Sequence, residues 1–144
     1  MFYTGIDQHK RTSYFTTVDS NGIILKQANV NNTNHDILNY FNQFDGKHSA
    51  TVESTGSWYW MSDLLEANNI KLSLAHAKFI KAIAYAKVKT DKVDSHILVQ
   101  LFRMNFIPES HKIDHDMRPL RDTLRARLRL SQKRTSALTL CTEC

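Results

Sequence analysis

Residues 2–28, FYTGIDQHKRTSYFTTVDSNGIILKQA, carry the pattern that decides the fold. Residues 2–7 and 13–18 are rich in aromatic and β-branched side chains, so both segments are predicted to be strands. The turn residues 19–22, DSNG, lead into a third strand over residues 23–28, because Gly22 can adopt the positive φ of a tight hairpin. We therefore expect three antiparallel strands to open the domain.

Helices and strands alternate in the next part of the chain. A polar cluster at residues 31–34 suits an N-cap, and apolar side chains then recur at helical spacing over residues 37–44. The segments predicted to follow are a strand ending at residue 53, a helix over 58–65, a strand over 70–74, a short helix over 79–84 and a helix over 93–102. The order βββαβαβα predicts an α/β fold with a mixed five-stranded sheet and flanking helices, the ribonuclease-H-like (RuvC-like) arrangement.

The character of the sequence changes after Pro108. From Met117 onward, a helix rich in arginine carries a thin apolar stripe made of Leu120, Leu124, Leu128 and Leu138. Such a stripe is typical of a coiled coil or of an arm that packs on a partner, so we expect a homo-oligomer through this helix. We predict a domain over residues 1–107, a linker loop over 108–116 and a basic, coiled-coil-like helical arm over 117–144.

Composition limits the class of protein. The chain has 144 residues, a formal net charge of +5 and a pI near 9.3, which favours an anionic partner. No apolar run approaches the roughly 20 residues that span a bilayer, and the N-terminus lacks the features of a signal peptide, so no membrane partner and a cytoplasmic location are expected. Cys141 and Cys144 form a lone C-x-x-C without a second pair at zinc-site spacing, and we interpret them as incidental.

Four acids occupy positions that this fold would bring together. Asp7 ends the first strand and Glu53 ends the fourth, and the two strands are neighbours in the predicted sheet. Asp91 and Asp94 open the last helix of the domain, three residues apart and therefore on one side of it. Converging carboxylates repel one another without cations, and hard oxygen ligands suit Mg²⁺ or Mn²⁺. The sequence therefore predicts a site for two divalent ions, which would activate a water or hydroxyl and stabilise the leaving oxygen of a phosphodiester.

Each acid also has a structural interpretation. The helix dipole favours acids in a first turn, so Asp91 and Asp94 after Thr90 fit N-terminal capping, and acids at strand ends commonly serve turns. The metal hypothesis depends on the agreement of all four in order and placement. His9, beside Asp7, is expected to be exposed, with assistance in proton transfer as the alternative.

Basic residues gather in two segments. Lys87, Lys89 and Lys92 flank the approach to the acids. The final helix carries a denser set that includes Arg121, Arg125, Arg127, Arg129 and Arg134. Within this stretch only Asp122 is acidic, so most of the positive charge is not neutralised by neighbouring side chains. We therefore expect the basic side chains to contact nucleic-acid phosphates. Surface ion pairs, each worth little, are the alternative for the lysines.

Four motifs carry a resemblance to a known family: Gly5-Ile6-Asp7 with Lys10, residues 53–56 (ESTG), residues 89–94 (KTDKVD) and the arginine-rich residues 120–127. By these residues the chain resembles the N-terminal, RuvC-like domain of DEDD insertion-sequence transposases of the IS110 type, relatives of the Piv DNA invertases. The resemblance implies that Asp7, Glu53, Asp91 and Asp94 are the family's metal-binding tetrad. It also implies site-specific recombination of DNA and a noncoding guide RNA that chooses the target.

The chain departs from the family in two respects. Ser95 stands where the family usually has a small Ala, and nothing in the chain corresponds to the family's second domain with its nucleophilic serine, so we expect a chain that stops before that domain. The leading hypothesis is a transposase or site-specific recombinase that performs metal-dependent cleavage or strand transfer on DNA. The alternative is a catalytically inactive fragment that binds nucleic acid and dimerises. An actin-like phosphotransferase is not favoured, because residues 8–11, QHKR, replace a glycine-rich phosphate loop.

Overall fold

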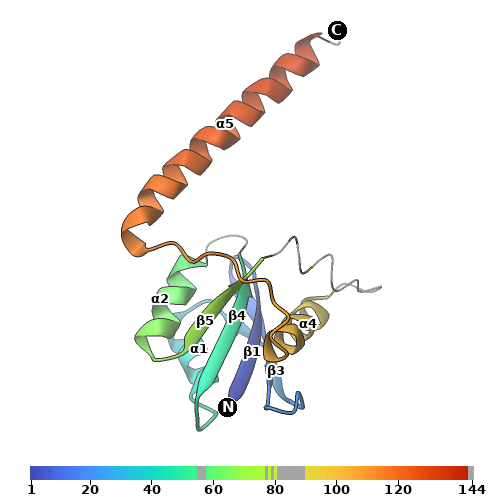
Figure 1. The fold of residues 1–144 in the computed structure, drawn as a ribbon, viewed down its shortest axis with the longest axis vertical. Helices are drawn as coiled ribbons and strands as arrows, with labels where there is room; N and C mark the ends of the chain where they lie inside the picture. Colours follow the sequence, from blue (N-terminus) through green and yellow to red (C-terminus); the bar gives the residue numbers. More distant parts are fainter. Residues whose placement is uncertain (55–57, 77, 79, 81–89, 143–144) are drawn as a thin grey trace. The chain divides into compact units, whose positions relative to one another are not determined.

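A mixed five-stranded sheet forms the centre of the first part of the chain (Figure 1). The computed structural model describes residues 1–54, 58–76, 78, 80 and 90–142, and these form two units, Met1–Ser110 and His111–Cys144. The strands, in the sheet order β3-β2-β1-β4-β5, are β3 (Ile24–Asn31), β2 (Thr12–Val18), β1 (Phe2–Gln8), β4 (His48–Glu53) and β5 (Lys71–Ala75). The first three pair antiparallel, whereas β4 and β5 run parallel to β1. The predicted α/β fold with a mixed five-stranded sheet is confirmed.

Strand β3 is longer than predicted. We expected it to end at residue 28, but its pairing with β2 continues until Asn31 lies opposite Thr12. The prediction was wrong because it ended the strand at residue 28 and assigned Asn31 to the polar cluster of the helix N-cap. The side chains of Asn29 and Asn31 are exposed on this edge strand, so their polarity does not oppose the backbone pairing that extends it.

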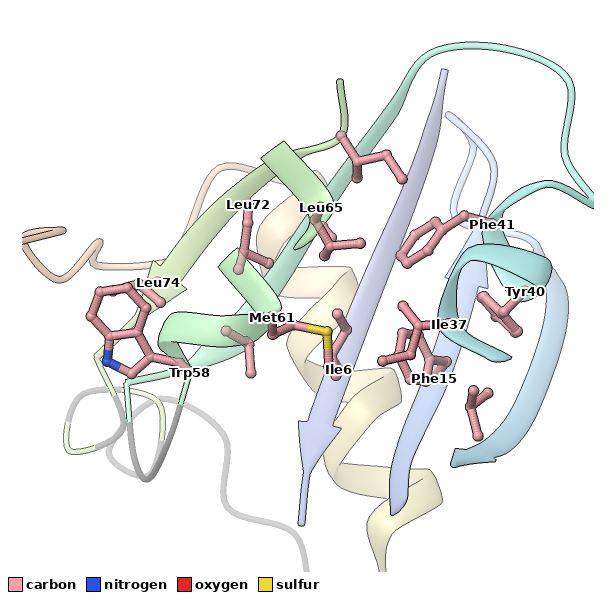
Figure 2. Close-up of a cluster of buried hydrophobic side chains, with 14 residues drawn as sticks. Ile6, Phe15, Ile37, Tyr40, Phe41, Trp58, Met61, Leu65, Leu72 and Leu74 are labelled. Atoms are coloured by element: carbon pink, nitrogen blue, oxygen red, sulfur yellow. The ribbon is translucent and has the colours of Figure 1, made fainter. Parts of the chain in front are cut away.

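Helices α1 (Asn34–Phe41) and α2 (Tyr59–Ala67) bury their apolar side chains against one face of the sheet. Thr33 caps α1, since its side chain accepts a hydrogen bond from the backbone N–H of Asp36 at 3.1 Å. Figure 2 shows the resulting core, which includes Ile6, Phe15, Ile37, Phe41, Trp58, Met61, Leu65, Leu72 and Leu74. The alternation of β1 turns Ile6 into this core and leaves its neighbours Gly5 and Asp7 on the other face.

Helix α4 (Asp91–Arg103) packs against β1 and β2 and is tied to the sheet by polar contacts along its length. The hydroxyl groups of Ser95 and Thr16 form a buried hydrogen bond of 2.7 Å. Further along the helix, Gln100 Nε2 donates to the carbonyl oxygen of Gly22 at 2.8 Å, and Arg103 Nη1 donates to that of Ser20 at 3.3 Å. The helix is therefore attached both to the middle of β2 and to the hairpin between β2 and β3.

The segment after α4 returns to the sheet. The backbone N–H of His76 donates to the carbonyl of Pro108 at 3.0 Å, and that of Ser110 donates to Leu74 at 2.8 Å. The beginning of the predicted linker thus runs beside β5, and the predicted domain boundaries stay a prediction. The short helix predicted over residues 79–84 lies outside the described residues, except for Ile80, which is buried.

The second unit consists mainly of the long helix α5 (Arg118–Thr142), which a short 3-10 turn (His115–Met117) precedes. The expected helical arm is present. The stripe residues Leu120, Leu124, Leu128 and Leu138 are each more than half exposed. Among the described residues, no helix combines the length and the apolar character needed to cross a membrane.

Candidate metal centre

A glycine allows α4 to lie directly on β1. A Cβ atom added to Gly5 would sit 2.4 Å from the carbonyl oxygen of Ser95 and 2.8 Å from the backbone nitrogen of Val99. Two residues earlier on the same face of the strand, the ring of Tyr3 meets that of Phe102 edge-on, with centroids 5.9 Å apart. The helix therefore runs opposite to the strand, and its first turn lies beside the end of β1.

This packing brings two acids of α4 to the end of the strand. Thr90 begins the helix, because its side chain accepts a hydrogen bond from the backbone N–H of Val93 at 3.2 Å. Asp91 and Asp94 then occupy the first turn. Asp7, two residues beyond Gly5 on the same face of β1, lies where this turn approaches the strand.

Three side chains form the closest group at this point. His9 Nε2 lies 3.2 Å from Oδ2 of Asp7 and also 3.2 Å from Oδ2 of Asp91. Asp7, His9 and Asp91 each offer one possible metal-ligand atom, and these three atoms all lie within 4.8 Å of one another. Asp7 is the most enclosed, with 21% of its side chain exposed, against 48% for His9 and 57% for Asp91.

The electrostatics of Asp7 show that negative charge is concentrated here. Burial raises the pKa of the Asp7 carboxyl above its ordinary value of 3.8. The neighbouring His9 lowers this pKa by charge and hydrogen bonding, whereas the carboxylates of Asp91 and Asp94 raise it further. Asp94 therefore lies within electrostatic reach of Asp7, although it is not one of the three residues of the closest group. A cation at this point would favour the ionised form of all three acids.

Glu53 lies at the same edge of the sheet. The register of β1 and β4 pairs Ile6 with Val52, so Asp7 and Glu53 follow at the next position of two parallel neighbours. Glu53 is partly exposed and lies outside the closest group of ligand atoms. The structure thus brings Asp7, Asp91 and Asp94 near one another, and places Glu53 at the end of the adjoining strand.

A model of a family described as transposase, the IS110-type DEDD transposases, matches residues 4–143. The chain belongs to this transposase family. The match spans both units of the structure, and it agrees with the mixed sheet and flanking helices that carry the acids. A comparison with curated proteins finds no significant match. Membership of a transposase family implies DNA as the substrate.

The basic residues predicted for this transposase fall in three places. Lys92 is exposed in the first turn of α4, next to Asp91. Lys87 and Lys89 lie outside the described residues. The predicted arginines all lie on α5, where Arg121 is partly buried and contacts Asp122 (3.9 Å between Nη1 and Oδ1), and where the exposed ones are Arg125, Arg127, Arg129 and Arg134.

Two features of the candidate site were missed by sequence reasoning. His9 was expected to be exposed and is half exposed, but its ring also touches two of the acids. Its position two residues after Asp7, on the same side of an extended chain, was the available signal. The close approach of α4 at Gly5 left no local signal, because it depends on where the helix packs.

Proposed function

We propose that this chain supplies the metal-dependent, DNA-processing site of an insertion-sequence transposase or site-specific recombinase. Its reaction would be cleavage or strand transfer at a DNA phosphodiester. The observation that carries the proposal is the shared contact of Asp7 and Asp91, acids from distant parts of the sequence, with one imidazole nitrogen at 3.2 Å. The family match supports DNA as the substrate, and we place the activity in the cytoplasm, as the sequence predicts.

The donor set fits hard divalent cations. Asp7, Asp91, Asp94 and Glu53 offer carboxylate oxygens, the ligands that Mg²⁺ and Mn²⁺ prefer. Burial together with the charges of Asp91 and Asp94 raises the pKa of Asp7, so the metal-free cluster carries repulsion that a cation would relieve. We propose that these four residues hold the ions. Bound divalent ions would supply an activated water or hydroxyl and stabilise the leaving oxygen of the phosphodiester.

The chain's own residues have separate tasks in this proposal. Asp7 is held by β1 and is the most enclosed ligand, so it fixes the position of the site relative to the sheet. Asp91 and Asp94 are held by the first turn of α4, which the contact at Gly5 keeps on β1. Rigid elements on both sides therefore keep the ligand atoms close together before any ion binds.

Helix α5 is proposed as the nucleic-acid and oligomer arm. Its exposed arginines suit phosphate contacts, together with Lys87, Lys89 and Lys92. The exposed leucines Leu120, Leu124 and Leu128, four residues apart on one helix, suit pairing with a second copy of α5. A noncoding guide RNA is a further expected partner, by the resemblance to the family.

A plasmid-nicking assay tests this proposal. The wild-type chain should nick supercoiled DNA with Mg²⁺ or Mn²⁺ and should not do so with EDTA. Replacing both acids, Asp7→Asn with Asp91→Asn, should lower the nicking rate by about two orders of magnitude or more, because metal ligands are lost. Asp45→Asn, which changes an exposed acid in the loop between α1 and β4, is the matched control and should nick at the wild-type rate. Equal rates for the double variant and the wild type would disprove the metal site.

The same assay separates the alternative function. Exposed arginines and leucines on α5 suit an inactive module that binds nucleic acid and dimerises. Such a module would shift DNA in a gel with and without metal and would nick it under neither condition. DNA binding combined with metal-dependent nicking would exclude it.

A further inference from the structure

His9 stands between two acids that belong to different elements. Asp7 comes from β1 and Asp91 from α4, and Nε2 of His9 is equally distant, 3.2 Å, from one carboxylate oxygen of each. We propose that His9 is a nitrogen ligand of the divalent ion held by Asp7 and Asp91, and that it shifts the preference of the site from Mg²⁺ towards Mn²⁺ and similar transition ions. The inference depends on the proposed function only for the existence of a metal site.

The spacing of the three atoms suits one coordination sphere. In an octahedral site with metal–ligand bonds of about 2.1 Å, adjacent ligand atoms are about 3.0 Å apart. The two distances from Nε2, 3.2 Å each, are close to this value, and the whole group falls within 4.8 Å. A small closing movement of the more exposed side chains, His9 and Asp91, towards Asp7 would bring the three donors onto one ion.

Hydrogen bonding alone explains the geometry less well. Nε2 of a histidine carries at most one hydrogen, so it can donate in a straight line to one oxygen at a time. Two equal distances of 3.2 Å lie at the long end of the range for N–H···O hydrogen bonds. A donor that served one acid would be expected nearer to that acid than to the other.

The backbone of His9 is fixed on both sides. Its N–H donates to the carbonyl of Thr12 at 3.1 Å, and its own carbonyl accepts from Asn32 Nδ2 at 2.7 Å. Asn32 is in turn an acceptor for the hydroxyl of Ser13 at 2.6 Å. These hydrogen bonds fix the turn that places the ring beside the acids. A preorganised metal ligand is expected to have such support.

The chemistry of the donors predicts the selectivity. Mg²⁺ prefers oxygen ligands, whereas imidazole nitrogen suits first-row transition ions, whose affinity rises from Mn²⁺ onward. A site of carboxylates with one imidazole would keep binding Mg²⁺ through its oxygens and would bind Mn²⁺ more tightly. Replacing His9 should therefore weaken Mn²⁺ binding more than Mg²⁺ binding.

Pulsed electron paramagnetic resonance of bound Mn²⁺ tests the assignment, with Mn²⁺ alone as the probe of the full chain. The wild type should show modulation from an imidazole nitrogen. His9→Ala should lose this modulation, with a Mn²⁺ dissociation constant raised about tenfold and a Mg²⁺ constant raised less than about threefold. His35→Ala, which removes an exposed histidine on α1, is the matched control and should behave as the wild type. Melting in EDTA and a second variant, His9→Gln, check that the loss does not come from misfolding.

The other outcomes are distinct. Mn²⁺ binding by the wild type without nitrogen modulation, or modulation that persists in His9→Ala, would overturn the role of His9 and leave the carboxylate site intact. Equal losses of Mg²⁺ and Mn²⁺ affinity would overturn the claim of selectivity. Failure of the wild type to bind either ion would overturn this inference and the proposed metal site together.

Discussion

The acids at the end of β1 and the arginines of α5 use charge in opposite ways. Asp7, Asp91 and Asp94 lie close enough for their charges to affect one another, and packing between a strand and a helix holds them there. The arginines Arg125, Arg127 and Arg129 instead stand exposed along a single helix. In the first region, the position of each carboxylate is expected to decide whether it can bind a metal ion. In the second, we expect the number of arginines to decide how strongly the helix binds nucleic acid.

The largest effect is expected where position is set by packing. Gly5→Ala would push a methyl group against the backbone of α4, which a Cβ would meet at 2.4 Å. Overpacking of this kind should lower the free energy of unfolding by about 3 kcal/mol and the melting temperature by roughly 10 °C. Thermal unfolding followed by circular dichroism measures the loss, with Ser20→Ala in the exposed hairpin as control. An unchanged melting temperature would mean that α4 does not rest on β1 as described.

A smaller effect is expected for a single acid. Asp94→Asn keeps the shape of the side chain but removes a charge and a ligand, so Mn²⁺ affinity should fall about 10- to 100-fold. Titration calorimetry and the thermal stabilisation given by Mn²⁺ both report this change. Asp122→Asn on α5 is the matched control. The same affinity in both variants would remove Asp94 from the site.

The exposed arginines should act through their number. Arg125→Ala with Arg129→Ala removes two phosphate contacts, so the slope of log K against log salt for DNA binding should become shallower by about two units. Fluorescence anisotropy at several salt concentrations measures the slope. Lys47→Ala with Lys71→Ala, which removes two exposed lysines at the far ends of β4 and β5, should leave the slope nearly unchanged. A slope that is the same for the arginine pair and the wild type would exclude those residues from the interface.

The smallest predicted effect is a gain in stability rather than a loss. Because the pKa of Asp7 is raised in the folded chain, the native state holds a proton more tightly than the unfolded state. Without metal, the free energy of unfolding therefore falls as pH rises from the ordinary value of 3.8 through the folded pKa. Asp7→Asn removes this penalty and should raise the melting temperature in EDTA by about 2–4 °C at pH 7, on the order of 1 kcal/mol.

Comparison of the same two proteins at pH 3.5 gives the control, because protonated Asp and Asn are both neutral. The difference in melting temperature should disappear there. A difference that persists at pH 3.5, or a destabilised variant at pH 7, would contradict the electrostatic explanation and would indicate that Asp7 serves packing instead.

The positions of the acids at the ends of strands could be predicted from the sequence. Parallel strands finish at the same edge of a sheet, so Asp7 and Glu53 could be placed at neighbouring ends from their order alone. Asp91 and Asp94 followed from their spacing after the cap Thr90. These inferences needed only the alternation of strands, the period of helices and the order of the elements.

Other features depend on contacts that local patterns do not encode. The ring of His9 reaches both acids because its backbone is held by Thr12 and Asn32, and no periodicity predicts a turn of that shape. The extension of β3 to Asn31 likewise follows from pairing with β2 and overrides the turn preference of asparagine. The contact of Asn32 with His9 and the pairing of Asn31 with Thr12 both join residues that are well separated in the sequence.

Because α4 is attached to the β2–β3 hairpin, we expect this hairpin to tolerate few changes in length or sequence. Surface hairpins usually accept insertions and drift in sequence. Here Gly22 has a φ of +86°, and a Cβ on it would lie within 2.9 Å of the side chains of Gln100 and Arg103. Lengthening this turn would break the hydrogen bonds that Gln100 and Arg103 make with it. These bonds hold the C-terminal end of α4, the end opposite to the first turn that carries Asp91 and Asp94. Among homologues, the length of this hairpin should therefore vary less than that of an ordinary surface turn. Sequence changes in the hairpin should occur together with changes in α4.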